Sequence, residues 1–353
     1  MFKKAILILF TLIFLLAACQ PSTDLAAPQT LTVITHDSFS VSSELVTQFE
    51  ETNNAKLVFI QGGDTGSVLN RLILTSVNND LPEADVFYGL DNTFLSRALE
   101  QDLFEPYQPE ALANIPTEFQ LDPSSKVLPV DYGDVCINYD KAYFKENNLA
   151  LPTSLQDLTK PEYKGLLVVE NPATSSPGLA FMFATIAEFG EKGWLSWWQA
   201  MRENQVAVVS DWETAYYTNF SGSSGKGPQP MVVSYASSPA AELIYAQTEL
   251  SESPTASLVA PGMCWRQVEF VGILKNSPNR ELAEKFVDFL FSKEFQEDVP
   301  MQMFVFPVLP EAVLPEDFVT ASQIPEVTGT LDPALIAQNR DQWINDWTET
   351  VIN

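Results

Sequence analysis

Short apolar segments rich in β-branched residues alternate with amphipathic segments along this chain, and the alternation restricts the folds that it can adopt. Leu31–Thr35, Leu57–Ile60 and Ala84–Tyr88 are continuous apolar runs of strand length. Between them, Ser42–Glu51 and Ser67–Val77 carry apolar residues at helical spacing. Continuous apolar strands separated by helices predict an α/β protein whose mostly parallel sheet is covered by helices on both faces.

The alternation continues beyond residue 90, where Asn92–Glu100 predicts a helix with Asn92 as its N-cap. A second series predicts, in chain order, a strand at 166–169, helices at 179–189 and 194–202, strands at 206–209, 230–235 and 268–274, and helices at 280–290, 292–298 and 333–352. Two extended segments, 126–139 and 264–274, predict hinge strands between two lobes that enclose a ligand cleft. We expect lobe 1 to comprise residues 30–131 and about 267–308, and lobe 2 to comprise residues 132–266 and about 309–353.

The first residues have the pattern of an export signal. Lys3 and Lys4 precede an apolar stretch that would span about 21 Å as a helix, short of the roughly 30 Å hydrocarbon core of a membrane. This predicts a secretory signal peptide over residues 1–18 and a polar, proline-containing tether over residues 19–29. Leu16–Cys19 (LAAC) resembles the lipobox of bacterial lipoproteins, which implies a lipid on Cys19 that anchors the protein to the outer face of the cell membrane. An ordinary signal peptide of a periplasmic protein is the alternative.

The charge balance and the scarce histidine and cysteine residues exclude several functional classes. The chain has 46 acidic and 19 basic residues and a formal net charge of −27, the wrong sign for binding nucleic acid. His36 is its one histidine, which excludes a zinc site built from several histidines. Outside the cytoplasm, where disulfides persist, we expect Cys136 and Cys264 to pair and tie the two hinge strands together. Two buried free thiols are the alternative.

Several short motifs follow one another in the order found in one family of transport proteins. They are LTVITHDSF (31–39), GDTGSVLNRL (63–72), ADVFYGLDN (84–92), PVDYGDVCINYDK (129–141), NPATSSPGL (171–179), SDWETAYY (210–217), VVSYASSPA (232–240), QVEF (267–270) and AQNRDQWINDW (337–347). The chain resembles the periplasmic thiamine-binding proteins, the solute receptors of thiamine ABC importers with the type 2 periplasmic-binding fold. The resemblance implies a monomeric receptor without enzymatic activity, metal or cofactor. It would capture thiamine, thiamine monophosphate or thiamine diphosphate and deliver it to a membrane permease and its ATPase.

The chemistry of thiamine indicates which side chains would hold it. Its thiazolium ring is permanently cationic, and aromatic faces together with a carboxylate suit such a charge. The resemblance implies that Trp212 and Tyr235 stack on the ligand, and Tyr235 ends a predicted strand, where open α/β sheets bind ligands. Core packing is the alternative for both rings. The resemblance assigns Asp64 and Thr65 to polar contacts with the ligand, although both residues also suit a helix N-cap.

Two serine-rich segments predict helix starts, whose free N–H groups can bind an anion such as phosphate. The resemblance assigns Ser175 and Ser176 from the first segment to the ligand. It likewise assigns Ala236, Ser237 and Ser238 from the second, which follows Tyr235 directly. Helix capping alone would also explain the serines.

Two positions depart from the family pattern. His36 stands where the family commonly has an aromatic ring, so it either stacks on the ligand or has a structural role. After Pro239, where family members can have a further aromatic residue, this chain has alanine, and Tyr245 is the nearest residue able to replace that ring.

Two other functions are alternatives to thiamine binding. A ferric-ion receptor of the same fold would use adjacent tyrosines, which Tyr216 and Tyr217 provide. A hydrolase would pair Ser38 with His36, but the sequence has no nucleophile elbow around this serine.

Overall fold

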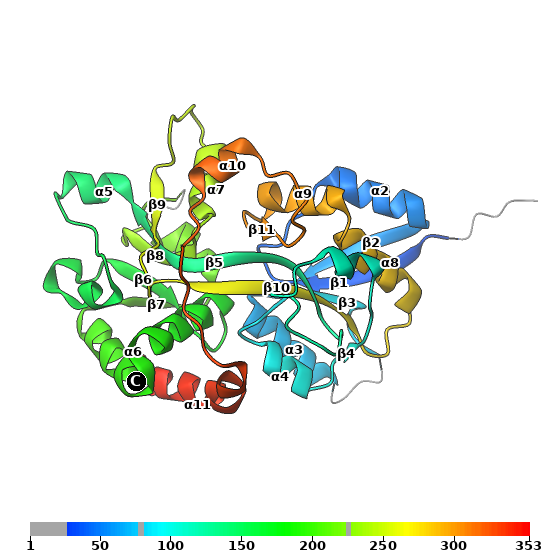
Figure 1. Ribbon diagram of the computed structural model, residues 1–353, viewed down its shortest axis with the longest axis horizontal. Coiled ribbons are helices and arrows are strands. Elements are labelled where there is room, and N and C mark those ends of the chain that lie inside the picture. Colours follow the sequence, from blue (N-terminus) through cyan, green and yellow to red (C-terminus); the bar gives the residue numbers. More distant parts are fainter. Residues whose placement is uncertain (1–26, 77–80, 224–226) are drawn as a thin grey trace, which may run out of the picture.

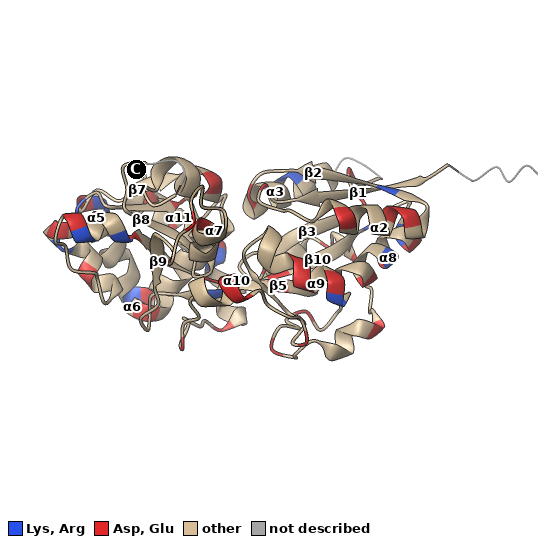
Figure 2. Cartoon of the chain, turned by 90° about the horizontal axis from the view of Figure 1, so that it is seen from above, with Lys and Arg blue, Asp and Glu red and all other residues tan. Residues whose placement is uncertain are grey.

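The computed structural model describes residues 27–76, 81–223 and 227–353, which form two lobes joined by long strands (Figures 1 and 2). The predicted signal peptide, Cys19 and most of the predicted tether lie outside the described residues. In the described part of the chain, none of the helices combines the length and the apolar character needed to cross a membrane.

Lobe 1 is built on three parallel strands. β1 (Gln29–Thr35) lies between β2 (Ala55–Gln61) and β3 (Val86–Asp91) and pairs with both in parallel. Because parallel strands end at the same edge of a sheet, the loops that follow β1 and β2 lie together and face the other lobe. The remaining elements of this lobe are α2 (Ser43–Asn53), α3 (Thr65–Ser76), α4 (Leu95–Glu100), β4 (Phe104–Glu105), η1 (Glu110–Asn114), α8 (Arg280–Leu290) and α9 (Lys293–Gln302).

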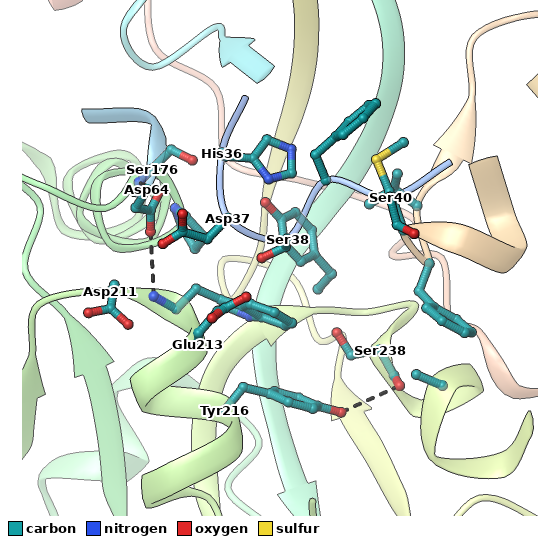
Figure 3. A pocket seen from close by; sticks show the side chains of 18 of the residues that line it. His36, Asp37, Ser38, Ser40, Asp64, Ser176, Asp211, Glu213, Tyr216 and Ser238 are labelled. Carbon is teal, nitrogen blue, oxygen red and sulfur yellow. Dashed lines mark hydrogen bonds between the residues drawn. The ribbon is translucent and has the colours of Figure 1, made fainter. Parts of the chain in front are cut away.

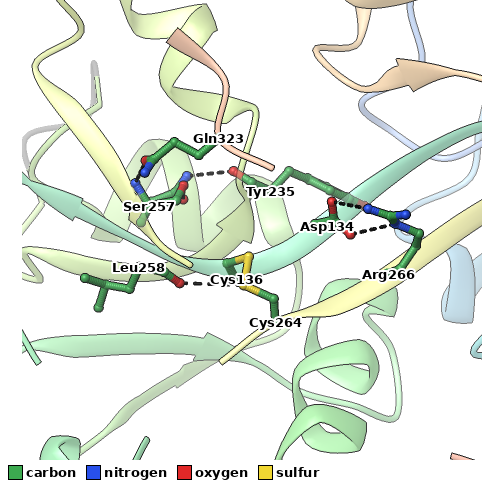
Figure 4. The surroundings of a disulfide bond; sticks show 9 residues. Asp134, Cys136, Tyr235, Ser257, Leu258, Cys264, Arg266 and Gln323 are labelled. Carbon is green, nitrogen blue, oxygen red and sulfur yellow. Dashed lines mark hydrogen bonds and ion pairs between the residues drawn. A yellow bond between two sulfur atoms is a disulfide. The ribbon is translucent and has the colours of Figure 1, made fainter. Parts of the chain in front are cut away.

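Two long strands cross from one lobe to the other (Figure 1). β5 (Leu128–Asp140) and β10 (Trp265–Leu274) pair antiparallel with each other, β10 also pairs with β3, and β5 pairs with strands of lobe 2. Cys136 and Cys264, the two cysteines expected to pair, form a disulfide between these strands with their Cα atoms 4.4 Å apart (Figure 4). Beside it, Arg266 donates two hydrogen bonds of 2.9 Å to Asp134. The hinge is therefore crosslinked by a covalent bond and an ion pair.

Lobe 2 repeats the parallel arrangement of lobe 1. β6 (Leu167–Glu170) pairs in parallel with β7 (Ala207–Val209) and β8 (Met231–Tyr235), while β9 (Thr255–Leu258) pairs antiparallel with β5. The other elements are α5 (Lys141–Glu146), η2 (Leu155–Thr159), η3 (Pro161–Tyr163), α6 (Ser176–Glu203), the π-helical turn η4 (Thr214–Asn219), α7 (Ser238–Ile244), α10 (Glu316–Ala321) and α11 (Pro333–Val351). The short strand β11 (Phe306–Pro307) pairs with β5 at the hinge.

The two helices predicted at 179–189 and 194–202 are both present within α6, which is interrupted at Gly190, where a φ of 67° suits glycine. The structure differs from the sequence prediction in two respects. The sheet is mixed rather than mostly parallel, because β5 and β10 run antiparallel to their neighbours as the chain passes between the lobes. Asn92 does not cap α4, since its amide donates to Arg266 O at 3.1 Å and accepts from Val268 N at 3.2 Å on β10. The expected lobe boundaries near residues 131 and 266 fall within continuous strands and stay a prediction.

Candidate functional site

A cavity of about 350 Å³ lies between the lobes and is lined by residues from both (Figure 3). Lobe 1 contributes the loop after β1, the loop between β2 and α3, and the turn after α9. Lobe 2 contributes the start of α6, the segment that enters η4, the end of β8, and α7. The lining residues include His36, Asp37, Ser38, Asp64, Thr65, Ser176, Asp211, Trp212, Glu213, Tyr216, Tyr217, Tyr235, Ser238, Tyr245, Glu269 and Phe304.

Asp64 accepts hydrogen bonds from both lobes. Its Oδ1 accepts from Thr65 N at 2.8 Å, within lobe 1, and from Ser176 N at 3.1 Å, at the start of α6 in lobe 2. Its Oδ2 accepts from Trp212 N at 3.4 Å, also in lobe 2 (Figure 3). Burial raises the pKa of the Asp64 carboxyl, although hydrogen bonds from Ser175, Ser176 and Thr65 oppose this effect. Asp64 thus joins the two lobes at one end of the pocket.

Aromatic rings form one wall of the pocket. The indole of Trp212 stacks on the ring of Tyr216, with centroids 5.0 Å apart, and lies 6.4 Å from the ring of Tyr235. Its Nε1 donates to Ser234 Oγ at 2.9 Å, which fixes the plane of the indole. Trp212 is half-buried and lines the cavity, so part of its indole is accessible from the cavity and is not packed in the core. Such a surface can hold a cationic ring.

The Tyr235 side chain is fixed by hydrogen bonds to the protein. Its hydroxyl donates to Gln267 Oε1 at 3.0 Å, and Gln267 Nε2 donates to Ser176 Oγ at 2.8 Å. Gln267 lies on β10 and is fully buried. This chain of hydrogen bonds fixes the Tyr235 ring relative to the start of α6.

His36 and Glu269 form an ion pair inside the pocket. His36 Nε2 lies 3.4 Å from the Glu269 carboxylate, and both side chains are largely buried. Burial lowers the pKa of His36, but the carboxylates of Glu269, Asp64 and Asp37 outweigh burial, so the net pKa is raised. His36 thus carries a proton more readily than an ordinary histidine, and its positive charge offsets part of the acidic lining.

Further carboxyl groups are buried beneath Glu269. In the register of the sheet, Glu269 lies opposite Asp91 of β3 and Asp131 of β5. Burial and the nearby Glu269 raise the pKa of Asp131 well above its usual range, and the Tyr88 hydroxyl donates to Asp131. Burial also raises the pKa of Asp91 to about 7, against the opposing hydrogen bonds from Thr93. Of these three carboxyl groups, Glu269 is the one that lines the pocket.

The residues assigned from the serine-rich segments separate into two groups. Ser176 and Ser238 line the pocket. Ser175 is fully buried as the N-cap of α6, and its Oγ accepts from Gly178 N at 3.4 Å. Ala236 and Ser237 are also buried and do not line the pocket, and the Ser237 hydroxyl donates to Phe304 O at 2.6 Å. Their assignment to the ligand stays a prediction, and their contacts in this structure are with the protein.

The other assigned residues, Asp64, Thr65, Trp212, Tyr235 and His36, all line the cavity. The Thr65 hydroxyl donates to Gly89 O at 2.7 Å, so this residue also connects the start of α3 to β3. Tyr245, considered as a replacement ring, lines the cavity and packs against Phe304 with centroids 5.4 Å apart.

Sequence reasoning missed most of the acidic lining. Asp37, Asp211, Glu213 and Glu269 all line the cavity, but none was singled out beforehand. Three of them directly flank residues that were chosen, and Glu269 lies in the QVEF motif. Adjacency to His36 and Trp212 was the available signal, although it does not reveal which neighbours point into the cleft.

The two alternative functions receive little support from this geometry. The Tyr216 hydroxyl donates to the backbone oxygen of Ser238 at 3.5 Å, and its ring is perpendicular to that of Tyr217, at 85°. The Tyr216 hydroxyl, one of the two phenols that would bind a ferric ion, is thus engaged with the backbone in this structure. In the part of the chain that the structure describes, His, Cys, Asp and Glu side chains form no group of three or more able to hold a metal ion. His36 is directed at Glu269 rather than serving as a base for Ser38.

Known proteins resemble this chain in sequence and in fold. Residues 82–319 match the family model of the bacterial extracellular solute-binding proteins. The thiamine-binding periplasmic protein of Salmonella typhimurium is 31% identical over 333 residues, which cover 92% of this chain and 94% of that protein. The solved structure of a periplasmic thiamin-binding protein has a TM-score of 0.79 at 28% identity and covers 92% of this chain and 96% of its own. A ferric-binding protein from Campylobacter jejuni, at 20% identity and a TM-score of 0.68 over 91% of this chain and 99% of its own, shares the fold alone.

These similarities confirm the two-lobed α/β fold and the family resemblance that the sequence predicts. The family model spans more than half of the chain, and the relative with 31% identity extends over nearly its whole length. The chain belongs to the family of bacterial extracellular solute-binding proteins, and periplasmic thiamine-binding proteins are among its relatives.

Proposed function

We propose that the protein is an extracytoplasmic receptor that captures thiamine or a thiamine phosphate and delivers it to an ABC permease and its ATPase. The observation that carries the proposal is the half-buried Trp212 indole in a cleft that is otherwise rich in carboxylates. An aromatic face and nearby carboxylates together suit a ligand with a cationic ring. The names of the relatives, which are thiamine-binding proteins, support the same ligand.

Each part of the pocket then has a role toward thiamine. Trp212 and Tyr235 would contact the aromatic rings of the ligand, and His36 would border the pyrimidine. Asp64 and Glu269 would provide the negative charge that balances the thiazolium. Ser176 and Ser238 line the cavity and would donate to or accept from the polar groups of the ligand.

The proposed mechanism is capture without chemical conversion, and it uses no cofactor and no metal. Ligand enters between open lobes, and closure surrounds it with residues from both sides. Closure is a shift of population toward the state that binds the ligand more tightly. The closed, monomeric receptor, held at the membrane through a lipid on Cys19, would then dock on the permease.

Isothermal titration calorimetry with thiamine tests the proposal directly. We expect one binding site per chain, and we expect Trp212→Ala to raise the dissociation constant at least about tenfold, since a cation–π contact contributes about 0.5 to 2 kcal/mol and stacking adds to it. Tyr143→Ala, which removes a half-buried ring on α5 outside the cleft, is the matched control and should leave the dissociation constant unchanged. Equal affinity of the Trp212→Ala variant and the unmodified protein would remove Trp212 from the site. Absence of any heat of binding with thiamine would refute the proposed ligand.

A further inference from the structure

We propose that Gly66 sets how closely the two lobes approach each other, and that this contact outside the cavity determines how tightly the receptor binds its ligand. The inference rests on the proposed function, because its main readout is the affinity for thiamine. It assigns a positioning role to residues that do not line the cavity. Three features of the structure carry it: the lack of space at Gly66, the fixed backbone on both sides of it, and a neighbouring contact between Phe94 and Arg340.

Gly66 lies in the first turn of α3, where lobe 2 leaves no room for a side chain. It is buried, and it follows Asp64 and Thr65, which line the cavity. A Cβ atom added at Gly66 would lie 2.7 Å from Thr174 O and 2.9 Å from Thr174 C, in the loop before α6. Carbon atoms that are not bonded to each other pack at about 3.5 to 4.0 Å, so an alanine does not fit while the lobes keep this separation. Glycine is therefore what allows the two backbones to approach here.

The backbone of Thr174 is held within lobe 2. Its N–H donates to Asn171 O at 3.1 Å, and its hydroxyl donates to Ser210 O at 2.6 Å. The next amide, Ser175 N, also donates to Asn171 O, at 2.9 Å. A side chain at Gly66 therefore cannot displace Thr174 O without disturbing hydrogen bonds that belong to lobe 2.

The start of α3 is held in the same way within lobe 1. The Thr65 hydroxyl donates to Gly89 O at 2.7 Å, which fixes the residue before Gly66 to β3. The residue after it, Ser67, donates its N–H to Asp64 O at 2.8 Å. Because the backbone is fixed on both sides, the overlap that a Cβ atom at Gly66 would create is relieved mainly by moving the lobes apart.

A second contact between the lobes lies beside Gly66. The buried ring of Phe94, at the start of α4 in lobe 1, has its Cζ 2.8 Å from the position of a Cβ atom at Gly66. The guanidinium of Arg340, on α11 of lobe 2, lies over the same ring, with its Cζ 4.5 Å from the ring centroid. Arg340 is also buried, and α11 packs against α4 (Figure 1). The lobes thus touch at two adjacent points outside the cavity, Gly66 against Thr174 and Phe94 against Arg340.

The contact at Gly66 is coupled to the cavity through Asp64, two residues earlier. Asp64 accepts from Ser176 N at 3.1 Å and from Trp212 N at 3.4 Å, both in lobe 2. These distances are at the long end of the range for hydrogen bonds, so any separation of the lobes weakens both bonds further. A smaller population of the state in which both lobes surround the ligand lowers the affinity. We therefore expect Gly66→Ala to weaken thiamine binding by roughly tenfold or more, the effect typical of overpacking a close-packed interior.

Calorimetric titration of the unmodified receptor and of Gly66→Ala with thiamine tests the inference. Gly193→Ala is the matched control, because Gly193 lies within α6 and a Cβ atom there would meet Phe189 of the same helix, at 3.2 Å, and no described atom of lobe 1. The Kd should rise by roughly tenfold or more in Gly66→Ala and stay unchanged in Gly193→Ala. Small-angle scattering with saturating thiamine should give a larger radius of gyration for Gly66→Ala than for Gly193→Ala.

A second pair of variants separates the contact between the lobes from crowding within lobe 1. Phe94→Leu removes the ring atom that lies 2.8 Å from the added Cβ, so the double variant Gly66→Ala and Phe94→Leu leaves Thr174 O as the obstacle. Compared with Phe94→Leu alone, the double variant should still bind thiamine roughly tenfold more weakly or worse. In denaturant titrations without ligand, both should unfold at the same midpoint, because separated lobes leave room for the methyl group. Recovered affinity in the double variant, or a lower midpoint, would place the damage within lobe 1 and overturn the inference.

The outcomes separate this inference from the proposed function. If Gly66→Ala binds thiamine as tightly as Gly193→Ala, the role of Gly66 is wrong while thiamine binding stands. If the unmodified receptor shows no heat of binding with thiamine, the proposed function is wrong, and scattering without ligand then decides the inference. A larger radius of gyration for Gly66→Ala than for Gly193→Ala would support it, and equal radii would overturn it.

Discussion

Replacing Asp64 by asparagine tests whether this side chain holds the two lobes together around the ligand. In this structure, Asp64 accepts from Ser176 N at 3.1 Å and from Trp212 N at 3.4 Å, and both donors belong to lobe 2. Asparagine has nearly the same shape but carries no charge. It keeps one acceptor oxygen and turns an N–H₂ donor toward one of the two N–H groups. The substitution therefore weakens the contact between the lobes while leaving the fold of each lobe unaffected.

The magnitude follows from the kind of hydrogen bond that is lost. A hydrogen bond to a charged group contributes about 1.5 to 3 kcal/mol, and about 1.4 kcal/mol corresponds to a tenfold change in affinity. We therefore expect Asp64→Asn to raise the Kd for thiamine by roughly ten- to a hundredfold, as measured by calorimetry. Small-angle scattering at equal ligand concentration should show a larger fraction of open receptor.

Asp37→Asn is the matched control for this experiment. Asp37 also lines the pocket with a carboxylate, but its Oδ1 accepts from Gly63 N at 2.9 Å, within lobe 1, and asparagine preserves this bond. We expect Asp37→Asn to weaken thiamine binding by much less than Asp64→Asn. Equal weakening by both variants would show that Asp64 acts through its charge alone, and unchanged affinity of Asp64→Asn would refute its role in closure.

Three further predictions follow from the hinge and the buried titratable groups. The Cys136–Cys264 disulfide closes a loop over a sequence separation of 128 residues. The double variant Cys136→Ala and Cys264→Ala should therefore lower the free energy of unfolding by about 5 kcal/mol in denaturant titrations. An unchanged midpoint of unfolding would contradict this. Because the pKa of His36 is raised, the protonated imidazole competes with a cationic ligand for Glu269, so thiamine affinity should rise with pH as His36 deprotonates. His36→Asn should flatten this pH dependence. An identical dependence of affinity on pH in the variant and the unmodified protein would refute the explanation. Burial raises the pKa of Asp91 to about 7, so the protonated carboxyl stabilises the fold fully below the pKa of the unfolded chain, and this contribution is lost as the pH rises through about 7. At about pH 8, Asp91→Asn should therefore be more stable than the unmodified protein by up to about 4 kcal/mol. A stability difference that does not depend on pH would argue against this explanation.

Local patterns in the sequence predicted the elements of the fold well. The apolar runs identified β1, β2 and β3, and the serines before Pro177 correctly indicated the start of α6. These features depend on neighbouring residues, so they can be recognised within a short window. The antiparallel course of β5 and β10 could not be recognised in this way, because it depends on pairing between segments far apart in the chain.

The composition of the site was only partly predictable for the same reason. Trp212 and Tyr235 were found through motifs, but the ion pair between His36 and Glu269 joins residues that lie far apart in the sequence. Asn92 illustrates the limit, since its type and position suit a helix cap while the nearby β10 backbone provides better partners. Local propensity gives way wherever the tertiary structure offers a stronger set of hydrogen bonds.

Native mass spectrometry of the receptor with thiamine tests the central claim, capture of the ligand without chemistry, most directly. We expect one adduct per chain whose mass equals intact thiamine, and release of the same unchanged molecule when the complex is activated in the gas phase. A chain that retains no thiamine under saturating conditions, or one that releases a cleaved or otherwise converted product, would contradict it.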